Sequence, residues 1–394
     1  MFKDIVDFIK SLYPGQNPVP LHAPVFLGNE KKYLADCVDS TFVSYVGKYV
    51  TKFEEMTAQY TGAKYAIAMV NGTTALQIAL QVAGVKPGDE VITQPLTFVA
   101  TANAISHCGA NPVFVDVDID TMGLSPQNLK DFLLKNYAIK PNGTFNRLTG
   151  NRLAAIVPMH TFGFPCRIDD IVEIADSFNV PVVEDSAESL GSYYKGRHTG
   201  TFGIAGILSY NGNKTITTGG GGMIITDSEE FAKMAKHLST TAKVSHSYDY
   251  VHDQVGYNYR MPNVNAAIGV AQMEKIEEYL LNKRGTSDIY REYFASKNID
   301  FAFEMKETKA NYWLNVIRLK DFNERNTFLD FANTNGVMTR PVWQLMNRLE
   351  MYKDCQASNL DNSEWLEERV VNIPSGVRIV CNNICLSGVV GMQS

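Results

Sequence analysis

Lys214 lies in a loop whose composition suits chemistry better than packing. It follows the apolar run GILSY and precedes a tract of four glycines and a second apolar run, MIIT. A lysine in a glycine-bounded loop between two strands is poorly placed for a core and well placed to meet a ligand. Once desolvated, such a lysine loses its proton more readily and can attack a carbonyl to form a Schiff base. Most loop lysines are solvated surface groups, so this segment alone does not predict a site. A second segment upstream strengthens the interpretation.

The second segment contains Asp185, which ends the short apolar run Val180-Pro-Val-Val-Glu-Asp. The carboxyl end of a strand is where open α/β sheets bind their ligands. An enzyme that uses pyridoxal phosphate needs a Schiff-base lysine and an acid that keeps the pyridine nitrogen protonated. Asp185 and Lys214 are the right residue types in the right order. The alternative for Asp185 is an ordinary N-cap or turn residue.

A third segment could bind a phosphate. The buried-strand pattern of Tyr65–Val70 is followed by Asn71-Gly72-Thr73 and then by an apolar helical pattern. A glycine lets the backbone approach an anion, the threonine supplies a hydroxyl, and a helix N-terminus supplies free N–H groups and a favourable dipole. A plain strand–helix turn capped by threonine is the alternative.

Together these segments resemble the DegT/DnrJ/StrS family of sugar-nucleotide aminotransferases, from about Val25 to Met351. The resemblance rests on motifs that occur in order along the chain. They are Asn71-Gly-Thr-Thr-Ala-Leu, Pro95-Leu-Thr-Phe-Val-Ala-Thr-Ala-Asn, Pro112-Val-Phe-Val-Asp-Val, Pro158-Met-His-Thr-Phe-Gly, Glu184-Asp-Ser-Ala-Glu, the Ser209–Met223 loop and Gly256-Tyr-Asn-Tyr-Arg-Met. The resemblance implies an α/β fold of type I, the aspartate-aminotransferase-like fold of pyridoxal phosphate enzymes.

The resemblance also implies roles for individual residues. Lys214 matches the Schiff-base lysine, and Asp185 matches the acid that pairs with the pyridine nitrogen. Gly72 and Thr73 match the phosphate-binding turn, and Ser209 matches a serine that also binds the phosphate. We therefore expect these residues to meet in one site.

Three further positions are implied in the same way. Phe98 matches the aromatic residue that stacks on the cofactor ring, whereas a core phenylalanine is the alternative. Asn258 matches an asparagine that reaches the phosphate of the neighbouring subunit's cofactor, which implies a homodimer with shared active sites. Glu188 stands where many members carry histidine or glutamine, and we expect it beside the cofactor; a surface glutamate on a helix is the alternative.

Composition agrees with a globular enzyme. The chain has 394 residues, of which 45% are hydrophobic and 20% charged, so it can form two substantial cores. Its net charge of −6 and the lack of a Lys/Arg cluster argue against nucleic acid and anionic membranes as partners. The six cysteines are scattered, and only Cys381 and Cys385 lie close together, which is a weak metal signal. With no signal peptide or membrane span recognisable, we expect a cytoplasmic protein.

Helical and strand patterns alternate regularly as far as Asp185, which predicts a large, mostly parallel sheet covered by helices. We expect residues 1–262 to form an N-terminal segment and this large cofactor-binding domain, and 263–394 to form a smaller C-terminal α+β domain. The predicted helices include an N-terminal helix docked on the body or on a partner, and one long helix from Asn263 to about Arg284. A loop is predicted near Pro141 to Asn151, and the tail after Arg378 shows no clear period.

The function implied is amino transfer from L-glutamate to C4 of a nucleotide-linked 4-keto-6-deoxy sugar for bacterial surface glycans such as lipopolysaccharide. Glu188, the Asn211-Gly-Asn-Lys loop and Arg340-Pro-Val-Trp-Gln-Leu-Met-Asn resemble the branch that acts on a UDP-linked 4-keto-6-deoxy-N-acetylhexosamine. GDP-linked 4-keto-6-deoxymannose, which yields perosamine, is the alternative. A pyridoxamine-dependent dehydratase of this fold would carry histidine in place of Lys214 or extra cluster-binding cysteines, and a regulatory relative would lose Lys214 or Asp185.

Overall fold

The computed structural model describes residues 1–380 and 383–384. Its centre is a sheet in two hydrogen-bonded parts, with strand orders β1-β11-β10-β7 and β3-β2-β6-β5-β4. Parallel bridges from Ile156 to Val182 and from Met159 to Asp185 join the two parts between β6 and β7. The strands are β1 (Tyr65–Met69), β2 (Glu90–Thr93), β3 (Asn111–Phe114), β4 (Tyr137–Lys140), β5 (Gly143–Asn146), β6 (Arg152–Val157), β7 (Val183–Asp185), β10 (Ala205–Ser209) and β11 (Gly222–Thr226).

The core of this sheet is mostly parallel, as the alternating pattern predicts. Strand β2 runs parallel to β3 and to β6, and β10 runs parallel to β7. Strand β11 is antiparallel to both of its neighbours, β1 and β10. Every residue of β2 and of β11 is buried, because helices cover both faces of the sheet.

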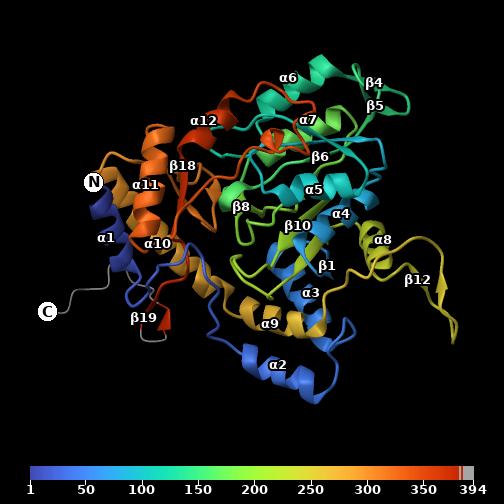
Figure 1. The fold of residues 1–394 in the computed structure, drawn as a ribbon. Coiled ribbons are helices and arrows are strands. Elements are labelled where there is room, and N and C mark those ends of the chain that lie inside the picture. Colours follow the sequence, from blue (N-terminus) through green and yellow to red (C-terminus); the bar gives the residue numbers. More distant parts are fainter. Residues whose placement is uncertain (381–382, 385–394) are drawn as a thin grey trace.

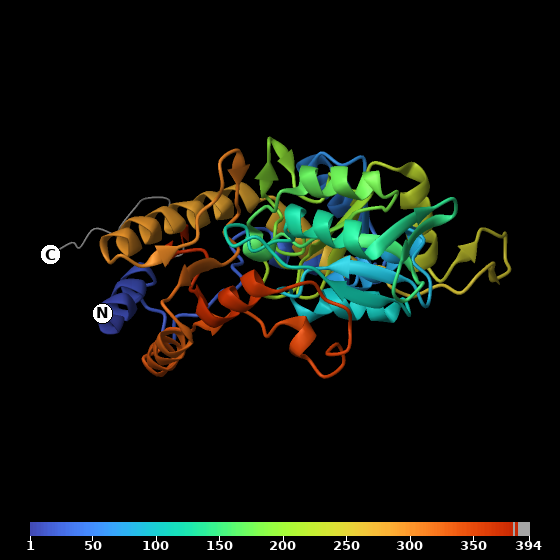
Figure 2. The ribbon, with the colours of Figure 1, turned by 90° about the horizontal axis from the view of Figure 1, so that it is seen from above.

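Successive residues of a strand serve different cores. In β1, Ile67 and Met69 belong to the core that contains α4 and α8, whereas Ala68 belongs to the core that contains α3 and α9. This follows from the period of two residues in a strand. The covering helices, seen around the sheet in Figures 1 and 2, are α3 (Lys48–Thr61), α4 (Gly72–Val82), α5 (Val99–His107), α6 (Pro126–Asn136), α7 (Ile168–Ser177), α8 (Glu229–Ser239) and α9 (Asn263–Met273). Helix α2 (Glu30–Asp39) packs on the outer side of α9.

A second group of elements forms a smaller sheet with order β14-β16-β18-β17, covered by helices. The N-terminal helix α1 belongs to this group: Ile5 and Ile9 are fully buried in one core with Phe328 and Tyr290, and Figure 1 shows α1 beside α11. The elements are α1 (Phe2–Leu12), α10 (Ile276–Ser296), β14 (Asp300–Phe301), β16 (Asn315–Arg318), α11 (Phe322–Thr334), β17 (Arg340–Pro341), α12 (Asp361–Arg369) and β18 (Val370–Ile373). The N-terminal helix therefore docks on the chain's own body.

The remaining strands are short. One small sheet joins β8 (Tyr193–Tyr194), β9 (Arg197–His198) and β15 (Thr308–Lys309), and another joins β19 (Ile379–Val380) to β20 (Asn383–Ile384). The hairpin of β12 (Lys243–Val244) and β13 (Val251–His252) extends away from the body in both views (Figures 1 and 2). Two single turns of 3₁₀ helix, Thr161–Gly163 and Met346–Arg348, complete the described elements. Within the described residues, no helix combines the length and apolar character needed to cross a membrane.

The long helix predicted from Asn263 is wrong as a single element. It divides into α9 and α10 at Glu274 and Lys275, where Lys275 has φ −116°. The Glu274 carboxylate accepts hydrogen bonds from Tyr33 Oη at 2.7 Å and from Asn29 Nδ2 at 2.8 Å. These contacts hold the junction against α2, so the chain turns there.

The loop predicted near Pro141–Asn151 is also wrong in part, because β5 lies inside it and pairs with β4. A buried carboxylate explains why this segment forms a regular hairpin. Glu90 accepts hydrogen bonds from Tyr137 Oη at 2.7 Å, Asn146 Nδ2 at 2.9 Å and Thr149 Oγ1 at 2.6 Å. These bonds fix the hairpin against the start of β2.

The structure covers four of the six cysteines and only the beginning of the tail after Arg378. Cys37, Cys108, Cys166 and Cys355 are free thiols. Cys381 and Cys385 lie outside the described residues, as does most of the tail after Arg378. Among the residues that are described, no cluster of His, Cys, Asp and Glu could hold a metal ion.

Candidate active site

A cavity of ≈ 320 Å³ lies at the carboxyl ends of β7 and β10. It brings together most of the residues that the sequence singles out. Those that line it are Gly72, Thr73, Phe98, Asp185, Glu188, Ser209 and Lys214. Asn258 is the exception: it is exposed, forms an isolated backbone bridge with Thr240, and is absent from the lining.

Lys214 enters the cavity from the connection between β10 and β11. This connection is closed by hydrogen bonds from Tyr210 N to Gly221 O and from Thr218 N to Tyr210 O, both 2.9 Å. The Lys214 side chain is 12% exposed, and its Nζ donates to Glu188 Oε1 at 3.1 Å. Nζ also lies 3.9 Å from the centre of the Trp313 ring, within the range of a cation–π contact. The lysine is thus held by two specific neighbours rather than solvated.

Glu188 is buried, with 1% of its side chain exposed, so the surface alternative is wrong. Its Oε1 faces Lys214, and its Oε2 accepts a hydrogen bond from Phe162 N at 2.9 Å. Burial raises the pKa of Glu188 to about 7, although Lys214 and the Phe162 amide act in the opposite direction. A carboxyl with such a pKa can gain or lose a proton near neutral pH.

Asp185 ends β7, and its neighbours fix its two oxygens. Oδ2 accepts from Thr101 Oγ1 at 2.7 Å, and Oδ1 accepts from Ala187 N at 3.1 Å. The strand itself is held by hydrogen bonds from Asp185 N to Pro158 O and from His160 N to Asp185 O. The carboxylate is therefore held in one orientation at the cavity, and its bond to Ala187 N shows that Asp185 also makes the turn that the sequence allows.

The beginning of α4 meets the end of β10. Asn71 caps the helix by accepting from Thr74 N at 2.8 Å, so Gly72 and Thr73 occupy its first turn. A Cβ placed on Gly72 would lie 3.2 Å from Ser209 Cβ, which shows how closely the two segments approach. Helix N–H groups and the hydroxyls of Thr73 and Ser209 thus border the same part of the cavity, an arrangement that suits a phosphate.

Phe98 precedes α5 and is 48% exposed, so it is not a core residue. Its ring lies 6.1 Å from that of Trp343, which in turn lies 4.9 Å from the Phe162 ring. Phe98 and Trp343 give the cavity an aromatic wall on one side, where a flat ring could stack, and the buried Phe162 packs behind Trp343.

The structure adds site residues that sequence reasoning missed. Trp313 and Trp343 line the cavity although each follows Lys214 by many residues. Asn311, which is fully buried, donates through Nδ2 to Glu188 O at 2.8 Å and Leu190 O at 2.9 Å, and accepts from Trp313 N at 2.8 Å. The rarity of tryptophan, at three in the chain, is the signal that could have drawn attention to Trp313 and Trp343.

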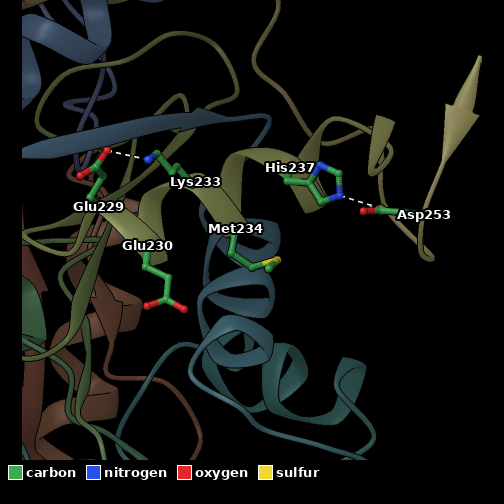
Figure 3. A pocket seen from close by; sticks show the side chains of 6 residues that line it. All are labelled: Glu229, Glu230, Lys233, Met234, His237 and Asp253. Atoms are coloured by element: carbon green, nitrogen blue, oxygen red, sulfur yellow. Dashed lines mark hydrogen bonds and ion pairs between the residues drawn. The ribbon is translucent and has the colours of Figure 1, made fainter. Parts of the chain in front are cut away.

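A second, larger depression of ≈ 640 Å³ lies on α8 beside the β12–β13 hairpin. Figure 3 shows two pairs among its side chains, Glu229 with Lys233 (2.6 Å) and His237 with Asp253 (2.8 Å), while Glu230 points away from both. These pairs lie at the surface, and the depression offers no buried lysine or carboxylate like those of the cavity at Lys214. The smaller cavity is therefore the better candidate for chemistry.

The cavity at Lys214 holds the set of groups that pyridoxal phosphate requires: a largely buried lysine, a fixed carboxylate, a helix N-terminus flanked by hydroxyls, and an aromatic side wall. Comparison with known proteins decides the matter, since the sequence profile of the DegT/DnrJ/EryC1/StrS aminotransferase family matches residues 27–384. The chain belongs to this family. It is accordingly a sugar aminotransferase that depends on pyridoxal phosphate, with the type I fold.

Individual relatives cover nearly the whole chain. The GDP-perosamine synthase of Escherichia coli O157:H7 is 37% identical, over 91% of this chain and 93% of its own. The GDP-perosamine synthase of Vibrio cholerae is 34% identical, over 93% and 98%. Among solved structures, an aminotransferase from Psychrobacter cryohalolentis is 26% identical with a TM-score of 0.80, over 90% of this chain and 93% of its own.

Proposed function

We propose that this aminotransferase moves an amino group from L-glutamate to C4 of GDP-linked 4-keto-6-deoxymannose. The observation that carries the chemistry is the convergence of Lys214 and Asp185 in one cavity, with Lys214 held by Glu188 and Trp313. The alternatives of a dehydratase or a regulatory relative are not supported, because both Lys214 and Asp185 are present and face the cavity.

The residues that would hold the cofactor divide by function. Lys214 would carry it covalently, and Asp185 would pair with the pyridine nitrogen. The first turn of α4 with Thr73 and Ser209 would bind its phosphate, while Phe98 would stack on its ring. Bound pyridoxal phosphate supplies an electron sink that stabilises negative charge on the carbon attached to the amino group.

Side chains of the protein would carry out the proton transfers. A lysine amine beside the reacting carbon can remove a proton from it and would return the proton to the cofactor carbon on the other side of the amino nitrogen. Asp185, oriented by Thr101, would keep the ring nitrogen protonated, and Trp313 would limit the access of water to Nζ. The same residues would serve amino donor and acceptor sugar in turn, because the second half of the reaction reverses the first.

The acceptor sugar proposed here differs from the one that the sequence favours. The resemblance of Glu188 and the Arg340 segment favours a UDP-linked N-acetylhexosamine as the acceptor. The relatives from Escherichia coli O157:H7 and Vibrio cholerae, at 37% and 34% identity, are both GDP-perosamine synthases, which favours the GDP-linked alternative. A role in bacterial surface polysaccharide, including lipopolysaccharide, is proposed on the same basis.

We further propose a homodimer in which Asn258 of one subunit completes the phosphate site of the other. The support is that Asn258 is exposed and does not line the cavity of its own chain. Light scattering of the purified protein tests the dimer, and an Asn258→Ala variant should lose cofactor affinity without losing its assembly.

The acceptor is tested on protein loaded with pyridoxal phosphate. L-Glutamate should bleach the visible band of the lysine-linked cofactor, and the GDP-linked 4-keto sugar should restore it. A UDP-linked 4-keto-6-deoxy-N-acetylglucosamine arm runs in parallel. Restoration by the UDP sugar alone would reverse the choice of acceptor, and a band that glutamate does not bleach would contradict amino transfer from glutamate.

A further inference from the structure

The contact between Lys214 and Glu188 joins a base to a group that can hold its proton. Nζ and Oε1 are 3.1 Å apart, and the side chains are 12% and 1% exposed, so bulk water competes little for this hydrogen bond. The other close neighbour of Nζ is the Trp313 ring at 3.9 Å, which has no site for a proton. Proton exchange between Nζ and Glu188 is therefore the short route on this side of the cavity.

The surroundings of Glu188 leave its carboxyl free to change charge. Asp185 lies on the same segment and disfavours the carboxylate, whereas Lys214 favours it. The turn at Phe162 offers one backbone N–H to Oε2, and the segment from the C-terminal part offers neutral groups, with Asn311 binding the backbone oxygen of Glu188. Behind that segment, Lys283 Nζ donates to Trp313 O at 3.2 Å and Arg284 Nη1 donates to Ala310 O at 2.7 Å, and burial lowers the pKa of Lys283 to about 7. Burial dominates this balance and raises the pKa of Glu188 to about 7.

We propose that Glu188 accepts the proton that Lys214 must lose before it can act as a base, a catalytic role that rests on the proposed function. In this step an N–H bond of the Lys214 ammonium breaks and an O–H bond forms at Glu188 Oε1. The electron pair stays on Nζ, which becomes the neutral amine. Glu188 returns the proton to Lys214 in the reverse direction, so the pair ends each half of the reaction in its starting state.

A lysine is a base only as the neutral amine, and an ammonium group held by a carboxylate and an aromatic face is stabilised in the wrong form. Transfer to Glu188 removes both charges together, which suits a buried place because no isolated charge remains. A glutamine in this position would keep the shape and the hydrogen bond but could not take the proton.

The test compares Glu188→Gln and Glu188→Asp with the wild type, all loaded with pyridoxal phosphate. The rate at which L-glutamate bleaches the visible band is measured between about pH 6 and pH 9. In the wild type this rate should fall as the pH drops through about 7, because a protonated Glu188 cannot accept another proton. Glu188→Gln should be slower by about 100-fold at pH 8 and should lose this inflection. Glu188→Asp should be slower but keep an inflection.

The outcomes separate this inference from the function on which it rests. If the wild type forms no visible band, or glutamate does not bleach it, the proposed function itself fails. If the wild type is bleached and Glu188→Gln shows the same inflection at a similar rate, the proton role is wrong and the function stands. A Glu188→Gln variant that changes only the half-saturating concentration of glutamate, with the inflection kept, would likewise reduce Glu188 to a binding residue. Should Glu188→Gln not fold, loss of the inflection in Glu188→Asp would overturn the proposal.

Discussion

Replacement of Asn311 by alanine should both destabilise the protein and disorder its active site. Asn311 is fully buried and links the segment before β16 to the segment that carries Glu188. Loss of its side chain would leave three buried polar groups without their hydrogen bonds to Asn311: Glu188 O, Leu190 O and Trp313 N, now bonded at 2.8, 2.9 and 2.8 Å. At about 1–2 kcal/mol for each unsatisfied group, the free energy of unfolding should fall by about 3–6 kcal/mol. That is a large part of the stability of an ordinary protein.

Urea unfolding followed by circular dichroism measures this change, and the catalytic rate of the folded variant measures the effect on the site. Asn335→Ala is the matched control, since Asn335 is exposed and its side chain donates one hydrogen bond, to Phe331 O at 2.8 Å, so its change should stay within about 0.5 kcal/mol. Because Asn311 also fixes the backbone of Trp313, activity should fall even where the variant remains folded. An Asn311→Ala protein that unfolds at the same urea concentration as the wild type would refute the hydrogen-bond reasoning.

Further predictions concern other parts of the site. Asp185→Asn should lower kcat by at least about 100-fold while the protein still binds pyridoxal phosphate; unchanged kcat in a steady-state assay would contradict the role of the carboxylate. Thr101→Val removes the donor to Asp185 Oδ2 at 2.7 Å with little change of shape, and should lower kcat by about 10-fold with less effect on KM. Gly163→Ala should unfold at clearly lower urea, because its φ of +93° is strained for alanine and its Cβ would collide with Asn311 Oδ1; a stability within error of the wild type would contradict this. Glu188 has an ordinary pKa of 4.5 and a folded-state pKa of about 7, so between these values the native state binds more protons than the unfolded state and stability falls as pH rises. The stability of Glu188→Gln relative to the wild type should therefore grow by about 3 kcal/mol between about pH 4 and pH 8 in urea titrations, and a constant difference would contradict it.

The sequence anticipated those parts of the site that are local in the chain. Asp185 ends β7, the Gly72–Thr73 turn begins α4, and Lys214 lies in the loop that follows β10. The carboxyl ends of the neighbouring parallel strands β7 and β10 must meet at one edge of the sheet. Periodicity likewise predicted the parallel sheet and its helices. These features depend on short segments whose pattern can be read without the rest of the chain.

The features that were missed depend on contacts between distant segments. Trp313 reaches Lys214 only because the smaller sheet folds back on the large one, and no local pattern of Trp313 reports that approach. The division between α9 and α10 depends on the hydrogen bonds from Asn29 and Tyr33 to Glu274. Glu188 is likewise held by a distant residue, since its Oε2 accepts a hydrogen bond from Phe162 N. The sequence around Glu188 does not report this contact, so it could not exclude a surface position for a side chain that is buried in the fold.

The most direct test of the account is to locate the covalent attachment of the cofactor. Purified protein loaded with pyridoxal phosphate is reduced with borohydride, digested, and analysed by mass spectrometry, with a Lys214→Arg variant as the control. The account predicts that the reduced cofactor is found on the peptide that contains Lys214 and is absent from the variant. Attachment to another lysine, or a labelled Lys214→Arg protein, would contradict the assignment of Lys214 on which the mechanism depends.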